Sequence, residues 1–218
     1  MNRFEAQVTK DDLEDFTESF LEKWIKNAPD DPCDDAPKAT IMDLAYSTGF
    51  PKRYREEWER PSDEEWIHQL DRLTKRMKQG GNIAIIGNRG TGKTRLAAEA
   101  MRDVSRSKGY YMTAMSLFVR VRASYQDNGE SEDRIIKEIA NVKMLVIDEI
   151  QERGNSKWED RLLTHILDKR YGAMLPTIII ANLKAAELTQ CLGDSISSRI
   201  SETGGILEMV GKSHRETE

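Results

Sequence analysis

Cysteine and histidine are scarce in this chain, whose 218 residues include two cysteines and three histidines. The cysteines, Cys33 and Cys191, are far apart in the sequence, and no Cys-x-x-Cys pair occurs. A zinc knuckle needs closely spaced cysteine and histidine ligands, so this class of metal site is excluded. With so few thiols we expect a reduced compartment, and we predict that the protein is cytoplasmic.

Long apolar segments are also missing. No run of about 18 or more apolar residues occurs, which argues against a membrane-spanning helix, and the first residues, MNRFEA, lack the apolar stretch of a secretion signal. The formal net charge is −5, whereas proteins that coat duplex DNA by bulk electrostatics are basic. We therefore expect no membrane contact, and any contact with nucleic acid must be local.

A phosphate-binding loop is the strongest motif that the sequence does contain. Residues 83–86 are apolar and predict a buried strand, a Gly-x-x-x-x-Gly-Lys-Thr turn follows, and a helical pattern comes next. The glycines let consecutive backbone N–H groups point at a triphosphate, and the start of the helix adds partial positive charge. We expect Lys93 to reach the β- and γ-phosphates of ATP and the Thr94 hydroxyl to bind Mg²⁺. The residues predicted to line the nucleotide are Gly87, Asn88, Arg89, Gly90, Thr91, Gly92, Lys93 and Thr94.

Strands and helices alternate along most of the chain. The apolar segments 83–86, 110–114, 144–147, 177–181 and 206–210 predict strands. Helices are expected after a Ser62-x-x-Glu65 capping box, over 93–108, 116–125 and 131–141, and after a second capping box, Ser156-x-x-Glu159. This alternation predicts an α/β fold in which a five-stranded parallel sheet lies between helices.

The N-terminal region reads as a separate appendage. Residues 9–26 have an apolar stripe typical of an amphipathic helix, and the acidic, proline-bearing segment 30–37 reads as a linker. We therefore predict a helical appendage over residues 1–38 and a main domain over 39–218. A lone helix cannot bury such a stripe, so it either folds back on the main domain or docks on another protein.

Polar residues follow the third and fourth predicted strands. Asp148 and Glu149 end the third strand, where we expect Asp148 to hold Mg²⁺ and Glu149 to act as the general base for the attacking water. Asn182 ends the fourth strand, where its amide can orient that water or contact the γ-phosphate. The alternatives are a solvent-facing acidic pair and an ordinary turn asparagine.

Two arginines near the end of the chain are candidates for reading phosphate. Ile196 and Ile200 predict a buried helical ridge that leaves Arg199 free to project toward a neighbouring subunit, where a guanidinium accelerates phosphoryl transfer. The alternative is a solvated helix arginine. Arg215, in the sequence GKSHR, is the second candidate.

Two aromatic residues lie near polar loops and near the basic residues Arg120, Arg122, Arg153 and Lys157. Tyr125 and Trp158, if exposed, can stack on the bases of single-stranded DNA. Ordinary packing at the edge of the core explains both aromatics equally well, and Ser156 is explained by its capping box.

Taken together, the motifs resemble those of the AAA+ helicase loaders of the DnaC type over residues 48–215. The resemblance rests on GNRGTGKT, LVIDEI, SKWE, the Arg170-Tyr171 pair ahead of Pro176-Thr177, ANL, LGDxxxxR and GKSHR, in that order. It implies that Lys93 and Thr94 are the Walker A pair, that Asp148 and Glu149 are Walker B, that Asn182 is sensor 1 and that Arg199 is the arginine finger. It also implies single-stranded DNA binding by Tyr125, Ser156 and Trp158, and an N-terminal region that grips the hexameric replicative helicase.

The chain departs from this family pattern in two ways. Ser195 stands where the family can carry a second arginine, which leaves phosphate sensing to Arg199 and Arg215. Too few residues follow Arg199 for a full AAA+ helical lid, so we expect self-association to close the ATP site and hydrolysis by the monomer to be weak. The alternatives are a transposition helper ATPase of the IstB type, acting on duplex DNA, and an adaptor that binds nucleotide without hydrolysing it.

Overall fold

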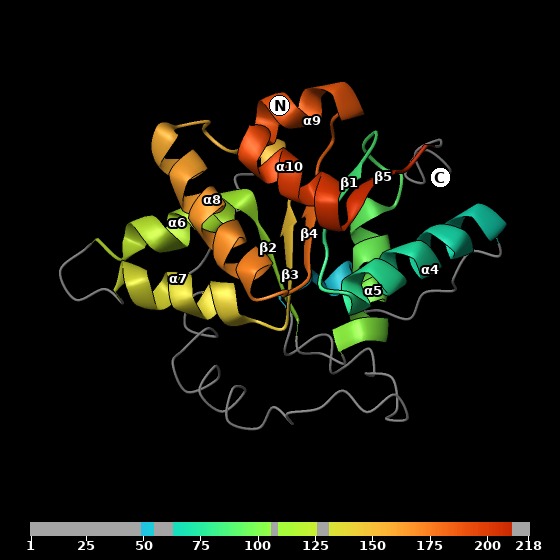
Figure 1. Ribbon diagram of the computed structural model, residues 1–218, viewed down its shortest axis with the longest axis horizontal. Coiled ribbons are helices and arrows are strands. Elements are labelled where there is room, and N and C mark those ends of the chain that lie inside the picture. The colour runs from blue at the N-terminus through green and yellow to red at the C-terminus, as the bar shows by residue number, and fades with distance from the viewer. Residues whose placement is uncertain (1–48, 55–62, 106–108, 126–130, 211–218) are drawn as a thin grey trace, which may run out of the picture. The chain divides into compact units, whose positions relative to one another are not determined.

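The computed structural model describes residues 49–54, 63–105, 109–125 and 131–210 (Figure 1). The predicted helix 9–26, the linker 30–37 and the domain boundary at residue 38 lie outside these residues, as does Arg215. These expectations therefore stay predictions.

A five-stranded parallel sheet forms the centre of the described domain, as predicted. Its strands are β1 (Asn82–Ile86), β2 (Gly109–Thr113), β3 (Met144–Asp148), β4 (Thr177–Ile180) and β5 (Gly205–Glu208). They lie in the order β2-β3-β4-β1-β5, and every neighbouring pair is parallel. All residues of β1, β3 and β4 are buried, which explains their unbroken apolar sequences.

Helices cover both faces of this sheet (Figure 1). On one side, α4 (Glu64–Lys78) and α5 (Lys93–Ser105) pack together, and α5 also packs on β3 and β4. On the other side lie α6 (Ala114–Ala123), α7 (Glu132–Asn141) and α8 (Lys157–Gly172). The remaining helical elements are η1 (Lys52–Tyr54), η2 (Ile150–Glu152), α9 (Ala185–Leu192) and α10 (Asp194–Thr203). No helix among the described residues is both long enough and apolar enough to cross a bilayer.

Several predicted boundaries differ from the structure. Ala114 was expected in the second strand, but it is the first residue of α6, because the Thr113 side chain caps that helix by accepting from the Ser116 backbone N–H at 3.1 Å. The predicted capping box of Ser62 and Glu65 was wrong, because helix α4 begins one residue later: its N-cap is Asp63, whose side chain accepts from the Glu65 N–H at 3.2 Å. Helix α9 was not predicted, whereas the capping box of Ser156 and Glu159 is present.

A buried arginine joins the elements at the amino edge of the sheet, where the strands begin. Arg170, in α8, has a fully buried side chain. Its guanidinium donates to the Thr177 hydroxyl at 2.9 Å and to the Pro176 carbonyl at 2.7 Å. It also donates to three carbonyls at the end of α7 and beyond it, those of Ile139, Ala140 and Val142. Burial lowers the pKa of Arg170 to about 9, and carbonyl oxygens take the place of water around its charge.

Candidate nucleotide-binding site

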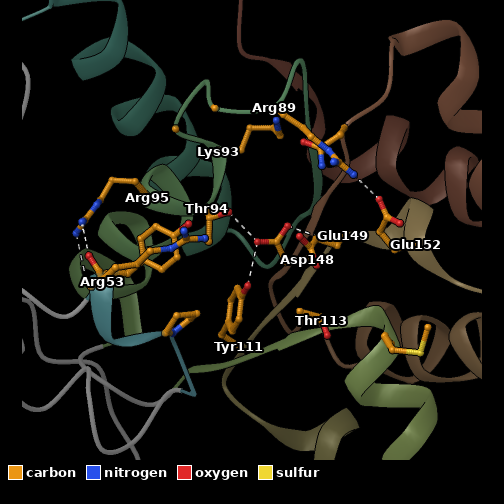
Figure 2. Close-up of a pocket in the computed structure, with 16 residues that line it drawn as sticks. Arg53, Arg89, Lys93, Thr94, Arg95, Tyr111, Thr113, Asp148, Glu149 and Glu152 are labelled. Carbon is orange, nitrogen blue, oxygen red and sulfur yellow. Dashed lines mark hydrogen bonds and ion pairs between the residues drawn. The ribbon is translucent and has the colours of Figure 1, made fainter. Parts of the chain in front are cut away.

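A cavity of about 1090 Å³ opens at the opposite, carboxyl edge of the sheet (Figure 2). Ligand clefts usually measure about 300 to 1,000 Å³, so this cavity is slightly larger than that range and has room for a small-molecule ligand. The predicted residues Arg89, Gly90, Gly92, Lys93, Thr94, Asp148, Glu149 and Asn182 all line it. The structure therefore brings the phosphate loop, the strand-end carboxylates and the strand-end amide into one place.

The lysine of the phosphate loop is hydrogen-bonded to the backbone of its own loop. Lys93 is buried, and its ammonium donates to the carbonyls of Gly87 at 2.9 Å and Asn88 at 2.5 Å. Gly87 has a φ of 133°, and a Cβ there would lie 2.3 Å from the Met209 carbonyl oxygen, so only glycine fits beside β5. The lysine bonds are ones that phosphate oxygens can replace, because Lys93 lies on the wall of the cavity.

Asp148 is surrounded by hydrogen-bond donors. Its Oδ2 accepts from the Thr94 hydroxyl at 2.7 Å and from the Tyr111 hydroxyl at 3.1 Å. Its Oδ1 accepts from the Glu149 backbone N–H at 2.7 Å. The oxygens of Thr94 and Asp148 thus lie side by side on the cavity wall, and oxygen ligands of this kind fit Mg²⁺.

Glu149 and Asn182 lie next to this pair. Glu149 adopts a left-handed backbone conformation, with φ 55° and ψ 42°, between β3 and η2. This conformation is uncommon for a residue with a side chain, and such residues concentrate at functional sites. Asn182 follows β4, and its backbone N–H donates to the Gln151 side chain at 3.0 Å, which ties β4 to the loop after β3.

A charged pair joins two rims of the cavity. Arg89, in the phosphate loop, lies 2.7 Å from the Glu152 carboxylate in η2 (Figure 2). Both side chains are largely exposed, at 74% and 48%. Water screens such a pair, so it contributes little to stability.

Sequence reasoning missed the opposite wall of the cavity. Pro51, Arg53 and Tyr54 line it, together with Arg95 of α5. Arg95 donates to the backbone carbonyls of Arg53 at 2.7 Å and Tyr54 at 3.3 Å, and both guanidinium groups lie about 5 Å from the Tyr54 ring centre. Tyr111, Thr113, Met115 and Glu152 were also missed. Alternation along β2 was the one available signal, since it places Tyr111 and Thr113 on the same side of the strand.

Arg199 does not project freely, so this expectation was wrong. Ile196 and Ile200 are buried as predicted, but the Arg199 guanidinium lies 3.0 Å from the Asp168 carboxylate of α8 and 5.6 Å from the centre of the Tyr171 ring. It also donates to the Ser195 carbonyl at 2.9 Å and to the Ser195 hydroxyl. Because α10 packs on α8, a carboxylate that is distant in the sequence reaches this arginine. Arg199 does not line the cavity of its own chain.

The candidate DNA-binding aromatics lie together. The Trp158 indole N–H donates to the Tyr125 hydroxyl at 3.2 Å, and Phe118 packs beneath Trp158 with ring centres 5.9 Å apart. Tyr125 is 57% exposed, and the Arg122 guanidinium lies 5.0 Å from the centre of the Trp158 ring. Ser156 caps the helix that carries Trp158.

Two of the four basic residues named with these aromatics are paired with carboxylates and are buried or half-buried. Arg153 is buried, 2.8 Å from the Asp160 carboxylate, and donates to the Cys191 carbonyl. Arg120 is 2.9 Å from the Glu138 carboxylate. Arg122 and Lys157 therefore remain as basic residues on the exposed surface near these rings.

The sequence is similar to those of several known proteins. A 125-residue stretch is 32% identical to the replicative helicase loader DnaC of Escherichia coli K12, covering 55% of this chain and 51% of that protein. The uncharacterized protein YdaV of the same organism is 31% identical over 126 residues, covering 57% of this chain and 50% of that protein. The chain thus spans about half the length of the curated relatives it matches.

Solved structures share the fold. The crystal structure of the DnaC helicase loader superposes with a TM-score of 0.60 at 23% identity, covering 73% of this chain and all of that one. The strand order, together with the similarity to this solved structure, identifies an AAA+ fold. The family model described as IstB-like ATP binding protein matches residues 53–217. The chain therefore belongs to the IstB-like family of ATP-binding proteins.

Proposed function

We propose that the protein is an ATP-dependent loader that binds the hexameric replicative DNA helicase and places it on single-stranded DNA. The observation that carries the proposal is that the phosphate loop and the carboxylate at the end of β3 meet at one cavity. The Thr94 hydroxyl meets the Asp148 carboxylate at 2.7 Å in a cavity that Lys93, Glu149 and Asn182 also line. The similarity to a replicative helicase loader supports this choice of function within the family.

The proposed reaction is hydrolysis of ATP to ADP and phosphate. Lys93 and the loop N–H groups bind the phosphates, and Thr94 and Asp148 hold Mg²⁺, which neutralises developing charge when it is bound. Glu149 accepts a proton from the attacking water, and Asn182 orients that water. The side chains of Glu149 and Asn182 come from the ends of neighbouring strands, which suits a shared task at one reacting atom.

Arg199 is proposed to act on the nucleotide of a neighbouring copy. Its absence from its own chain's cavity supports a role in trans. Arg199 contacts Asp168 and Ser195 in its own chain. To act in trans, its guanidinium must either contact the neighbour's phosphate while keeping these contacts, or leave them. Self-association through the ATP site, and weak hydrolysis by the monomer, follow from this arrangement.

The test is co-elution with the hexameric replicative helicase of the organism that encodes the chain. We expect a complex on size-exclusion chromatography that responds to ATP, that Lys93→Ala makes insensitive to ATP, and that a chain lacking residues 1–38 fails to form. Absence of any complex, with and without ATP, contradicts the loader proposal.

Single-stranded DNA is proposed to bind at Tyr125, Trp158 and Ser156. An exposed tyrosine beside a tryptophan and an arginine offers a stacking surface, and each base stacked is worth about 1–3 kcal/mol. Tyr125→Ala is expected to weaken binding of a labelled oligo(dT) about tenfold in fluorescence anisotropy. Met174→Ala, which removes another exposed large side chain at a different place in the fold, is the control.

A helper ATPase acting on duplex DNA is the second candidate, because the family model that matches is the IstB-like one. The two candidates differ in the DNA they prefer. ATP-dependent assembly on duplex DNA, measured by light scattering, together with no helicase complex, favours the helper. A Glu149→Gln variant with unchanged ATP turnover instead favours an adaptor that binds nucleotide without hydrolysing it.

A further inference from the structure

Tyr111 reaches the metal-binding carboxylate from the neighbouring strand. It lies in β2, paired with Val146 of β3, two residues before Thr113 pairs with Asp148. The side chain is buried, with 8% exposure, and its hydroxyl lies on the cavity wall, 3.1 Å from Asp148 Oδ2 (Figure 2). A phenol from β2 thus contacts the same oxygen that accepts from Thr94.

The ring of Tyr111 is held firmly in place. Phe50 stacks on it, with ring centres 4.4 Å apart and an angle of 29° between the planes. Phe50 is itself buried. The backbone before Phe50 passes so close that a Cβ on Gly49 would lie 2.6 Å from the Tyr111 carbonyl oxygen. A packed ring of this kind fixes the direction of its hydroxyl.

The donors around Asp148 differ in what they can do when the site fills. The Thr94 hydroxyl is a candidate metal ligand, so its bond to Asp148 is open to exchange. The Glu149 N–H holds only Oδ1. Tyr111 contacts Oδ2 without being a candidate ligand, and its hydrogen bond can persist in the filled site. A tyrosine phenol is ordinarily protonated at neutral pH, so Tyr111 can act as the donor in this hydrogen bond.

We propose that Tyr111 is a positioning residue for Mg²⁺, whose hydroxyl fixes the rotation of the Asp148 carboxylate about its Cβ–Cγ bond. This inference rests on the proposed ATP and Mg²⁺ site. Side chains that orient a metal ligand typically change metal affinity by about ten- to a hundredfold when they are removed. Water from the open cavity can replace the lost donor in part, so we expect the lower end of this range.

The chain supplies a matched control in the preceding residue. Tyr110 lies on the same strand, but alternation points its side chain to the other face of the sheet. Burial raises the pKa of Tyr110, and Arg120 is its charged neighbour in place of Asp148. Tyr110, which is half-buried, does not line the cavity, so Tyr110→Phe removes a phenol hydroxyl from the same strand without changing the site.

The experiment measures binding of a fluorescent ATP analogue to the full chain across a range of Mg²⁺ concentrations and in EDTA. Tyr111→Phe keeps the ring and its stack on Phe50. We expect it to raise the Mg²⁺ concentration for half-maximal effect about tenfold, with affinity in EDTA changed less than about twofold. Tyr110→Phe is expected to match the wild type in both conditions.

Other outcomes overturn the proposal in distinguishable ways. An unchanged Mg²⁺ curve for Tyr111→Phe, or equal weakening with metal and in EDTA, shows that Tyr111 does not act through the metal site. A wild-type chain that binds no nucleotide, or binds it without regard to Mg²⁺, overturns the proposed site as well.

Thermal unfolding without nucleotide confirms that each variant is folded. Should Tyr111→Phe fail to fold, Phe50→Leu removes the stack and keeps the hydroxyl, and it is expected to shift the Mg²⁺ curve about two- to threefold. No shift in that variant contradicts the proposal.

Discussion

Buried charged side chains occur at both edges of the sheet, but their partners differ. At the amino edge, Arg170 donates to four backbone carbonyls and one hydroxyl, all within the chain. At the carboxyl edge, Lys93 and Asp148 are almost as buried, yet both line a cavity. The first set of bonds has no competitor and contributes to stability. The second set lies on the wall of a cavity, where a ligand of the proposed nucleotide site can replace some of these bonds.

The largest expected effect tests the amino edge. Arg170→Met removes the guanidinium and leaves its carbonyl partners buried without a donor, which is expected to lower the free energy of unfolding by about 4 kcal/mol. Chemical denaturation measures the loss. Arg161→Met, a change at an exposed arginine of the same helix, is the control and should stay within about 0.5 kcal/mol. Equal stability of the two variants would contradict the contrast between the edges.

The next effect tests the carboxyl edge. Glu149→Gln keeps the size and shape of the side chain but removes the proposed base, so ATP turnover is expected to fall about a hundredfold. Nucleotide affinity should change little, because the proposed role of this side chain is toward the attacking water, while Lys93 and the loop N–H groups bind the phosphates. A phosphate-release assay and a binding titration separate the two quantities. Glu64→Gln, on the exposed first turn of α4, is the control.

A glycine at the amino edge provides the third comparison. Gly80 has a φ of 80°, and a Cβ there would lie 2.3 Å from the Met174 carbonyl oxygen. Gly80→Ala is therefore expected to cost about 2 kcal/mol or more in unfolding free energy. At Gly172, the last residue of α8, a Cβ meets nothing within 4 Å. Gly172→Ala should be neutral or slightly stabilising, and a loss as large as that of Gly80→Ala would be evidence against the tight packing at this edge.

The smallest effect concerns Arg199. Asp168 and Arg199 are partly exposed, at 42% and 25%, so solvent screening limits their pairing to about 0.5–1 kcal/mol. A double-mutant cycle with Asp168→Asn and Arg199→Gln measures this coupling from unfolding free energies. Coupling near zero would mean that Arg199 is available to a neighbour at no cost. Coupling of the expected size means that assembly must compete with Asp168.

The sequence predicted the carboxyl edge far better than the remainder of the site. Strand ends carry Asp148 and Asn182 to one edge because parallel strands share a direction, so local pattern alone places them. Tyr111 could not be assigned in this way, because its contact with Asp148 depends on the order and register of β2 and β3. The same limit applies to Arg199. Its helix and the buried ridge could be predicted from the sequence. The Asp168 carboxylate, however, belongs to another helix, 31 residues earlier in the chain (199 − 168).

The bridge between Arg89 and Glu152 has one consequence for how an occupied chain differs from an empty one. A triphosphate in the cavity attracts Arg89 and competes with Glu152 for it, since both side chains line the cavity and are exposed. Once Arg89 turns inward, Glu152 becomes an uncompensated negative charge at the rim. A basic surface approaching within a Debye length, about 8 Å at physiological salt, would then distinguish the two occupancies by Coulomb attraction, with no movement of the backbone.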